Sequence, residues 1–269
     1  YRIRIAPAGS MDVVFDSGTV ALADGADLLV AATNNTGSGD SPVTLLVADG
    51  ESAVKLWDAN TTADIRVVHG ISDAPAVDVI ANNELVLVDA LAFPMATDYL
   101  SVMPADYLID VVADADNSIV AIDDAAVTLE TGMSYTAIAN NELAAPELDL
   151  LMDMPRRVAT EAKVRIIHAS PAAGSVDIYV TGDGEIADVD PAFAGVDYST
   201  DALAETGYVS LAAGEYFVTV TAAGTKEAAI ATGSLMLDAG NVYTAIAVNG
   251  AIEGALPQLI LLDDFVATP

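Results

Sequence analysis

The sequence contains no cysteine and very few basic residues. Without cysteine, the chain has no disulfide framework, no thiolate nucleophile and no zinc-thiolate site. Only 9 Lys and Arg stand against 40 Asp and Glu, which gives a formal net charge of −31. A surface this negative repels nucleic-acid phosphates and anionic lipid headgroups, so we expect no nucleic-acid partner. No apolar run approaches the roughly 20 residues of a membrane-spanning helix, so we expect no membrane insertion.

Apolar residues are nevertheless abundant. They make up 53% of the chain, and the mean hydropathy is +0.46, which excludes an acidic disordered protein. An acidic chain with few lysines is typical of proteins that face salty water outside the cell, although the same composition also keeps an Ala- and Val-rich protein soluble. We expect an extracellular or cell-envelope (secreted) protein.

Short apolar segments, separated by Gly, Asn, Asp and Pro, run along the whole chain. In the segment GEYFVTVTA, the residues Tyr216, Val218 and Val220 fall on one face of a strand. Other segments are equally short and rich in β-branched or aromatic residues, which favours strands over helices. The sequence therefore predicts an all-β protein, with strands that include 65–69, 107–113, 134–139, 214–222 and 242–248.

An internal repeat divides the chain. In the segment DIRVVHGISDAPAVDVI, His69 and Asp78 match His168 and Asp177 of KVRIIHASPAAGSVDIY. We therefore predict two repeat units, at 63–160 and 161–269, joined by a linker at 153–163. The matching segments are 64–80 with 163–179, 129–141 with 237–249, and 148–153 with 259–264.

Residues 1–62 form a weaker third copy that holds only the second half of a repeat, and we call them the half-unit. Its segments 5–15 and 22–35 echo 102–112 and 129–141. Half of a β-sandwich leaves an apolar sheet face and an unpaired strand edge. Either a neighbouring unit, a further segment or another chain completes it. Strand pairing with another copy would produce a polymer, whereas packing on the neighbouring unit is the simpler alternative.

A corner motif with the pattern Leu-x-x-Gly-x-x-Tyr occurs in both repeat units. It contains Gly132 and Tyr135 in the first unit, and Gly240 and Tyr243 in the second. Glycine allows the corner backbone, and a tyrosine at the start of the next strand can bond back to the main chain upstream. The motif predicts tandem Ig-like or transthyretin-like β-sandwich modules.

These motifs together resemble a known family. The pattern His-x-Ser-Pro-x-Ala-x-x-Val-Asp, the Pro-Ala-Gly-x-Tyr hairpin and the Gly-x-x-Tyr-Thr corner are similar to the bacterial and archaeal domain of unknown function 4397, over most of 63–269. The sequence departs from the pattern at Ser72, which lies one position later than Ser170, and at Asp106, which replaces a glycine. The resemblance implies extracytoplasmic β-sandwich modules, often in tandem, and no established activity.

The two histidines are the one feature that suggests catalysis. His69 with Ser72 and Asp78 would form a nucleophile constellation, and the second unit repeats it with its own His, Ser and Asp. The G-x-S-x-G nucleophile elbow is absent from the sequence. We therefore predict structural roles for the repeated histidines and aspartates, and no enzymatic activity.

Acidic turns supply hard oxygen ligands of the kind that Ca²⁺ prefers. Ca²⁺ is the one cofactor that we consider, with solvated acidic turns as the simpler alternative. The sole tryptophan, Trp57, is either a platform for a surface glycan or a plug between modules. The candidate calcium ligands are Asp114, Asp116, Asp123, Asp188 and Asp190.

The sequence thus favours a non-enzymatic structural or adhesive protein of the extracellular space or cell envelope. Its expected partner is itself, as a homo-oligomer or polymer that self-assembles by strand complementation through the half-unit. The alternative is a carbohydrate- or calcium-binding module of a secreted protein.

Overall fold

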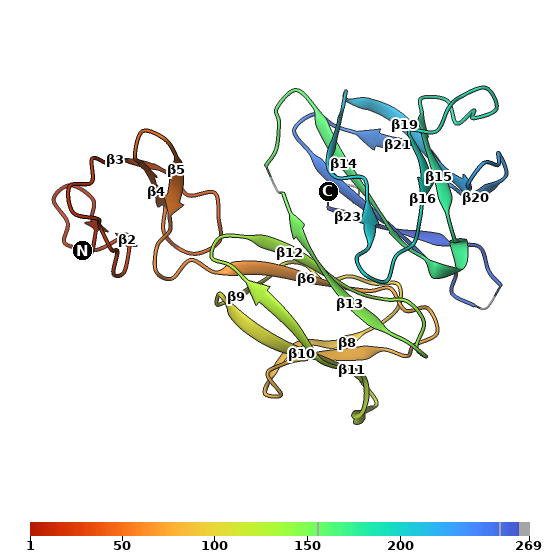
Figure 1. Ribbon diagram of the computed structural model, residues 1–269, viewed down its shortest axis with the longest axis horizontal. Coiled ribbons are helices and arrows are strands. Elements are labelled where there is room, and N and C mark those ends of the chain that lie inside the picture. The colour runs from red at the N-terminus through yellow and green to blue at the C-terminus, as the bar shows by residue number, and fades with distance from the viewer. Residues whose placement is uncertain (155, 253, 264–269) are drawn as a thin grey trace. The chain divides into compact units, whose positions relative to one another are not determined.

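The computed structural model describes residues 1–154, 156–252 and 254–263. The described elements are β-strands and one short 3₁₀ helix, η1 (Pro171–Ala173), as Figure 1 shows. None of them is a helix that is long and apolar enough to cross a membrane. The chain falls into two compact units. Unit 1 contains Tyr1–Ile65, Tyr99–Tyr107 and Ala126–Tyr135, and unit 2 contains Arg66–Asp98, Leu108–Ala125 and Thr136–Pro269.

The half-unit contains one two-stranded and one three-stranded sheet. In the larger sheet the order is β3-β4-β5, and both pairings are antiparallel. Arg2 and Arg4 both pair with Asp16 of the small sheet. The strands are β1 (Arg4–Ile5), β2 (Phe15–Asp16), β3 (Leu29–Asn34), β4 (Val43–Ala48) and β5 (Ala53–Leu56).

The first full repeat forms two four-stranded sheets with the orders β11-β10-β7-β8 and β13-β12-β6-β9. Its strands are β6 (Ala63–His69), β7 (Val77–Ala81), β8 (Leu85–Leu91), β9 (Leu100–Val102), β10 (Ala105–Ala113), β11 (Asp116–Leu129), β12 (Ser134–Asn140) and β13 (Glu147–Asp153).

The second full repeat uses the same plan in two five-stranded sheets, ordered β17-β14-β22-β23 with β18 beside β14, and β16-β15-β19-β20 with β21 beside β19. β14 and β22 are parallel. The prediction of tandem all-β sandwiches is confirmed. The strands are β14 (Ala162–Ala169), β15 (Val176–Thr181), β16 (Phe193–Val196), β17 (Ala204–Glu205), β18 (Val209–Leu211), β19 (Gly214–Ala222), β20 (Ala228–Ala231), β21 (Leu235–Leu237), β22 (Val242–Val248) and β23 (Gln258–Asp263).

The central strands of the two repeats are apolar on both faces. In β14, Val164 and Ile166 point into the second sandwich, where they join its internal core. The alternate residue Ile167 belongs to a different cluster, which also contains Val68 and Ile138 of the first repeat. Successive strand residues face opposite sides, so a run such as VRIIHA is buried only when both faces are covered.

The two full repeats therefore share a hydrophobic core. Val68, Ile138, Ile167 and Ile246 are all fully buried where the repeats meet. Burial of one such side chain stabilises a protein by about 1.5–3 kcal/mol. These residues all belong to unit 2, so strands of both repeats pack together within that unit.

Candidate functional site

His69 and His168 occupy the same place in the two repeats and make the same bonds. The Nε2 atom of His69 lies 2.9 Å from the carbonyl of Pro75, and its Nδ1 accepts the N–H of Ile71 at 3.3 Å. In the second repeat, His168 bonds the carbonyl of Gly174 at 2.7 Å and the N–H of Ser170 at 3.4 Å. Because Nδ1 accepts, each ring carries its proton on Nε2 and is neutral. Burial lowers the pKa of both histidines.

This geometry leaves neither imidazole free to act as a general base. Both ring nitrogens of each histidine already bond the main chain. The hydroxyl of Ser170 donates to Oδ1 of Asn249 at 2.7 Å, away from the ring. A nucleophile needs its base within hydrogen-bond reach, so this arrangement favours a structural role for the histidine turns.

Asp78 and Asp177 bond neighbouring strands at irregular points of the strand pairing. Oδ1 of Asp78 accepts the N–H of Ala90 at 2.9 Å, and Oδ1 of Asp177 accepts the N–H of Gly195 at 2.8 Å. Ala90 and Gly195 both have a positive φ, of 52° and 61°. Oδ2 of Asp177 accepts the N–H of Gly224 at 2.8 Å, and these main-chain bonds hold the pKa of Asp177 below its usual value.

The two corner tyrosines are buried and bond back to the main chain. The hydroxyl of Tyr135 accepts the N–H of Glu130 at 3.2 Å, and that of Tyr243 accepts the N–H of Asp238 at 2.9 Å. The geometry is that of a tyrosine corner.

Glycine is needed at the first corner for two reasons. Gly132 has a φ of +71°, and a Cβ placed there would lie 2.5 Å from the ring of Trp57. The matching Gly240 has a φ of +85° and open space around it. Trp57 also has the amino group of Lys55 at 4.8 Å from its ring centroid. The tryptophan therefore covers the corner of its own compact unit.

The acidic residues gather in sets that differ from those expected. Asp114 meets Asp78 and Asp89, and Asp123 meets Asp110 and Asp124, with the carboxylate oxygens of each set within 4.8 Å of one another. The strand residues Asp78 and Asp110 were not anticipated as ligands. A signal was available for Asp110, because it lies on the strand that leads directly to Asp114.

The other candidate ligands lie apart from these two sets. The carboxylate of Asp116 accepts the hydroxyl of Ser118 at 2.7 Å. Within the described residues, neither set of three includes Asp188 or Asp190. The turn that carries those two residues is instead held by Lys226, whose amino group donates to the carbonyls of Ile186 and Val189.

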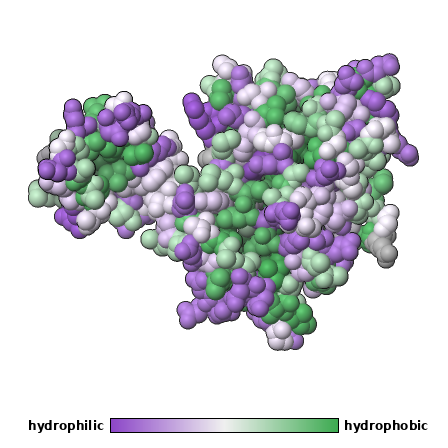
Figure 2. Space-filling view, in the orientation of Figure 1, coloured by the Kyte–Doolittle hydropathy of each residue, from purple (hydrophilic) through white to green (hydrophobic). Residues whose placement is uncertain are grey.

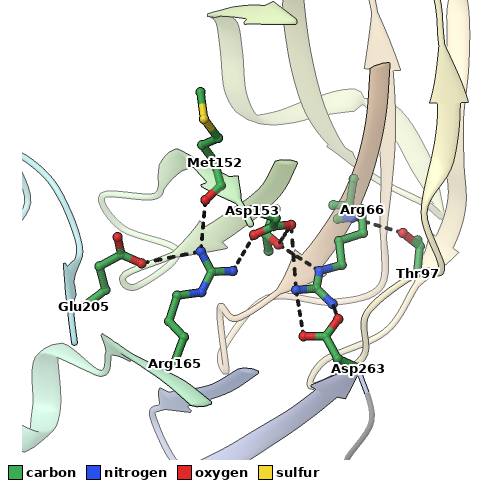
Figure 3. Close-up of polar contacts among 9 residues, drawn as sticks. Arg66, Thr97, Met152, Asp153, Arg165, Glu205 and Asp263 are labelled. Carbon is green, nitrogen blue, oxygen red and sulfur yellow. Dashed lines mark hydrogen bonds and ion pairs between the residues drawn. The ribbon is translucent and has the colours of Figure 1, made fainter. Parts of the chain in front are cut away.

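A buried network of charged residues lies where the two full repeats meet (Figure 3). Arg66 lies on β6 and Arg165 lies at the matching position of β14. Asp153 and Asp263 are the last residues of β13 and β23, and each of these is the last strand of its repeat. Arg66 pairs with Asp263, and Arg165 pairs with Asp153. Each arginine thus binds the side chain of the aspartate that ends the last strand of the other repeat.

Further contacts support the network on each side, and among its guanidinium nitrogens Nε of Arg165 is buried without a hydrogen-bond partner in the described part of the chain. Nε of Arg66 donates to Oγ1 of Thr136 at 2.8 Å, and Thr136 donates to Asp153 at 2.6 Å. Arg165 donates to the carbonyl of Met152 at 3.2 Å and lies over the ring of Tyr208 at 4.6 Å. This network was not predicted from the sequence, although two matching arginines in a chain with nine basic residues were a signal for it.

The comparisons with known proteins support the resemblance to a family. Residues 63–179 match the family model described as a domain of unknown function (DUF4397), which confirms the resemblance over the first repeat and the histidine segment of the second. No protein of curated function matches the sequence significantly.

Two solved structures are similar to parts of the chain. One is a family CBM26 carbohydrate-binding module from Eubacterium rectale in complex with maltoheptaose, with 9% identity, a TM-score of 0.26, and coverage of 74% of this chain and 96% of that one. The other is a candidate cell adhesion protein from Bacteroides fragilis, with 10% identity, a TM-score of 0.22, and coverage of 76% and 97%. At these TM-scores the likeness carries no conclusion about function.

Proposed function

We propose that this protein is a non-enzymatic structural or adhesive element of the extracellular space or cell envelope. The exchange of buried ion pairs between the repeats is the observation that carries the proposal. Arg66 and Arg165 each pair with a carboxylate of the other repeat as well as one of their own, so these ion pairs couple the two repeats. A rigid body of stacked sandwiches suits a load-bearing or spacing role, because relative motion of its modules would leave buried charges unpaired.

The repeated polar residues support a role without catalysis. The histidines, aspartates and corner tyrosines of both repeats all bond main-chain groups of nearby turns or neighbouring strands. Side chains that are used in this way stabilise loops and do not activate a substrate. The acidic composition supports an exterior location, because a highly charged surface keeps a protein soluble in salty water.

Antibody labelling tests the location. Antibodies raised against the purified chain should label intact cells that produce it, and mild protease treatment of those cells should remove the signal. A cytoplasmic protein with a known antibody serves as the control for cell integrity. Labelling that requires permeabilised cells would contradict the proposal.

Differential scanning calorimetry tests whether the two full repeats unfold together. Residues 63–263 should unfold in one cooperative transition, because the shared core and the exchanged ion pairs couple the repeats. Two separate transitions for the full repeats would contradict a rigid structural role.

Self-association through the half-unit is the narrower version of this proposal. Another copy would have to donate a strand, yet β6 and β14 are each flanked by strands on both sides within the described chain. Repulsion between copies of charge −31 also opposes assembly at low ionic strength. Light scattering over a range of salt and protein concentrations measures the molar mass in solution. A monomer at every concentration would contradict self-association through the half-unit.

Calcium binding is the second candidate function, and the two carboxylate sets favour it. Each set brings three carboxylates within 4.8 Å, which is compatible with part of the oxygen shell of Ca²⁺. Titration calorimetry with CaCl₂ should show saturable heat, and Asp123→Asn should weaken it while Asp24→Asn should not. NaCl at equal ionic strength controls for screening. Equal responses to both salts would remove the calcium version.

Glycan binding has less support than calcium binding. The aromatic residue on which it would depend, Trp57, lies against Gly132 and beneath Lys55. A sugar-stacking platform needs an open ring face.

A further inference from the structure

The strand β3 of the half-unit matches β12 and β22 in sequence and differs from both in burial. In β12 and β22, nearly every residue is buried. In β3, by contrast, five of the six residues are exposed, with Leu29 at 69% and Val30 at 44%. Figure 2 shows hydrophobic surface on the part of the molecule formed by the first five strands. An exposed apolar strand edge of this kind is a site at which a further strand can pair.

The full repeats show which neighbour is missing. β12 lies between β13 and β6, and β22 lies between β23 and β14. β3 keeps only the equivalent of the first partner, β4, and within the described chain no strand pairs with its other edge. In the second repeat that edge is occupied by β14, which runs parallel to β22 from Lys163, opposite Val242, to Ala169, opposite Val248.

An open cavity marks the core that the missing strands would fill. Its volume is about 600 Å³. It is lined by Ile3 near the start of the chain, and by Val30, Val47 and Leu56 on one face of the sheet β3-β4-β5. In the second repeat, the corresponding sheet face packs on the opposite sheet, which includes Val176 and Ile178 of the first half-repeat.

We propose that the free edge of β3 is a docking site for a first half-repeat supplied from outside residues 1–269. The docked segment carries the chemistry of Ala63–Leu91 or its counterpart in the second repeat. Its first strand runs parallel to β3, in the manner of β14 beside β22, and its apolar residues fill the cavity. The inference goes beyond the proposed structural role. It depends on the repeat geometry and not on the location of the protein.

A second intact copy of the chain is a poorer occupant. It can release a first-half strand only by opening one of its own sandwiches, because β6 and β14 are both central strands. Two chains of charge −31 also repel each other more strongly than one chain repels a half-repeat such as 63–91, which carries only five acidic residues and one arginine.

The pairing of β3 with β4 shows which main-chain groups are available. The N–H of Asn35 donates to the carbonyl of Pro42. Hydrogen-bonded pairs alternate along an antiparallel ladder, so the N–H groups of Val30 and Ala32 point toward the free edge. Ala32→Pro therefore removes a donor from the docking edge and leaves the bonds to β4 in place, and proline is tolerated on edge strands.

The test restores the missing half by fusion. The match of Ile5 with Val102 means that a second copy of residues 63–97, placed directly before Tyr1, regenerates the order of a full repeat. Hydrogen–deuterium exchange of residues 29–34 should slow by roughly tenfold or more relative to the unextended chain. Melting followed by Trp57 fluorescence should shift to higher temperature. The same fusion with Ala32→Pro should show neither effect. Ala32→Pro in the unextended chain should change neither the hydrogen–deuterium exchange of β3 nor the melting temperature.

Several outcomes would overturn the inference. One is a folded fusion in which residues 29–34 exchange as fast as before. Another is protection in the unextended chain that is lost on dilution, because a second copy would then occupy the edge. If the fusion aggregates, the peptide 63–91 added to the unextended chain must produce the same protection, and its failure to do so counts against the proposal. None of these results affects the surface location, which cell labelling tests separately.

Discussion

Arg165 and Asp153 belong to different repeats, and their side chains form an ion pair at 0% and 2% exposure. The matching Arg66 pairs with Asp263 in the opposite direction. This reciprocity arises because each arginine lies on the outer face of a central strand, beside Val68 or Ile167 of the shared core. The polar and apolar parts of the interface thus come from alternate positions of the same two strands.

Removal of Asp153 should destabilise the body of two repeats strongly. Asp153→Ala leaves Arg165 without its buried carboxylate and removes the acceptor of Thr136. We expect a loss of about 3–5 kcal/mol in the free energy of unfolding, measured by chemical denaturation. Arg2→Ala breaks an exposed pair with Asp16 and is the control, with a loss of at most about 1 kcal/mol. Equal losses for the two variants would show that the buried pair is not critical.

Thr136 and Thr244 occupy matching positions, and they should respond oppositely to the same substitution. Oγ1 of Thr136 bonds Arg66 and Asp153, whereas Oγ1 of Thr244 is buried with no hydrogen-bond partner. Thr136→Val should cost roughly 1–3 kcal/mol because it leaves charged groups unsatisfied. Thr244→Val should be neutral or stabilising, since it removes a desolvated hydroxyl. Denaturation of the two variants side by side checks this, and a similar loss in both would contradict it.

The sequence predicts the strands, the repeats and the corners because these features are local. Alternation, turn residues and the spacing from Gly132 to Tyr135 all act within a few residues of chain. The tyrosine corners appear in the structure with their expected main-chain bonds. One feature of these strands was not predicted. The runs RVVH and RIIH are apolar at consecutive positions, which indicates a strand that is covered on both faces.

The partners of the charged residues could not be predicted from the repeat alone. A repeat pattern aligns Arg66 with Arg165, but it does not show that each bonds a carboxylate of the other unit. That choice depends on how two sheet faces pack. The acidic sets illustrate the same limit, since Asp114 and Asp123 are close in sequence and join different carboxylates.

Gly132 and Gly240 provide a matched test of the role of Trp57. Alanine at either position is strained by the positive φ, at a cost of about 1 kcal/mol. Only Gly132→Ala also places a Cβ 2.5 Å from Trp57, which adds roughly 1–3 kcal/mol of overpacking. We expect Gly132→Ala to lower the melting temperature more, and to change the fluorescence of Trp57. An equal effect of Gly240→Ala would mean that the contact with Trp57 contributes nothing.

The buried histidines should make the fold less stable as the pH falls below neutral. Burial lowers the pKa of His69 and His168 in the folded state, while the unfolded state titrates near 6.5. The unfolded chain therefore binds more protons below pH 6.5, and the stability present above that pH is lost on acidification. Protonation of Nδ1 would also break the bonds from Ile71 and Ser170.

The size of this effect has an upper limit. Each histidine contributes at most about 1.4 kcal/mol per pH unit to the decline in unfolding free energy. Denaturation between pH 7.5 and 5.5 should show the decline, and the double variant His69→Gln, His168→Gln should be less stable at pH 7.5 and should lack the histidine part of the decline. Glu147, whose pKa burial raises, acts with the opposite sign and is present in both proteins, so their difference isolates the histidines. An identical slope in both proteins would show that the rings titrate alike in the folded and unfolded chains.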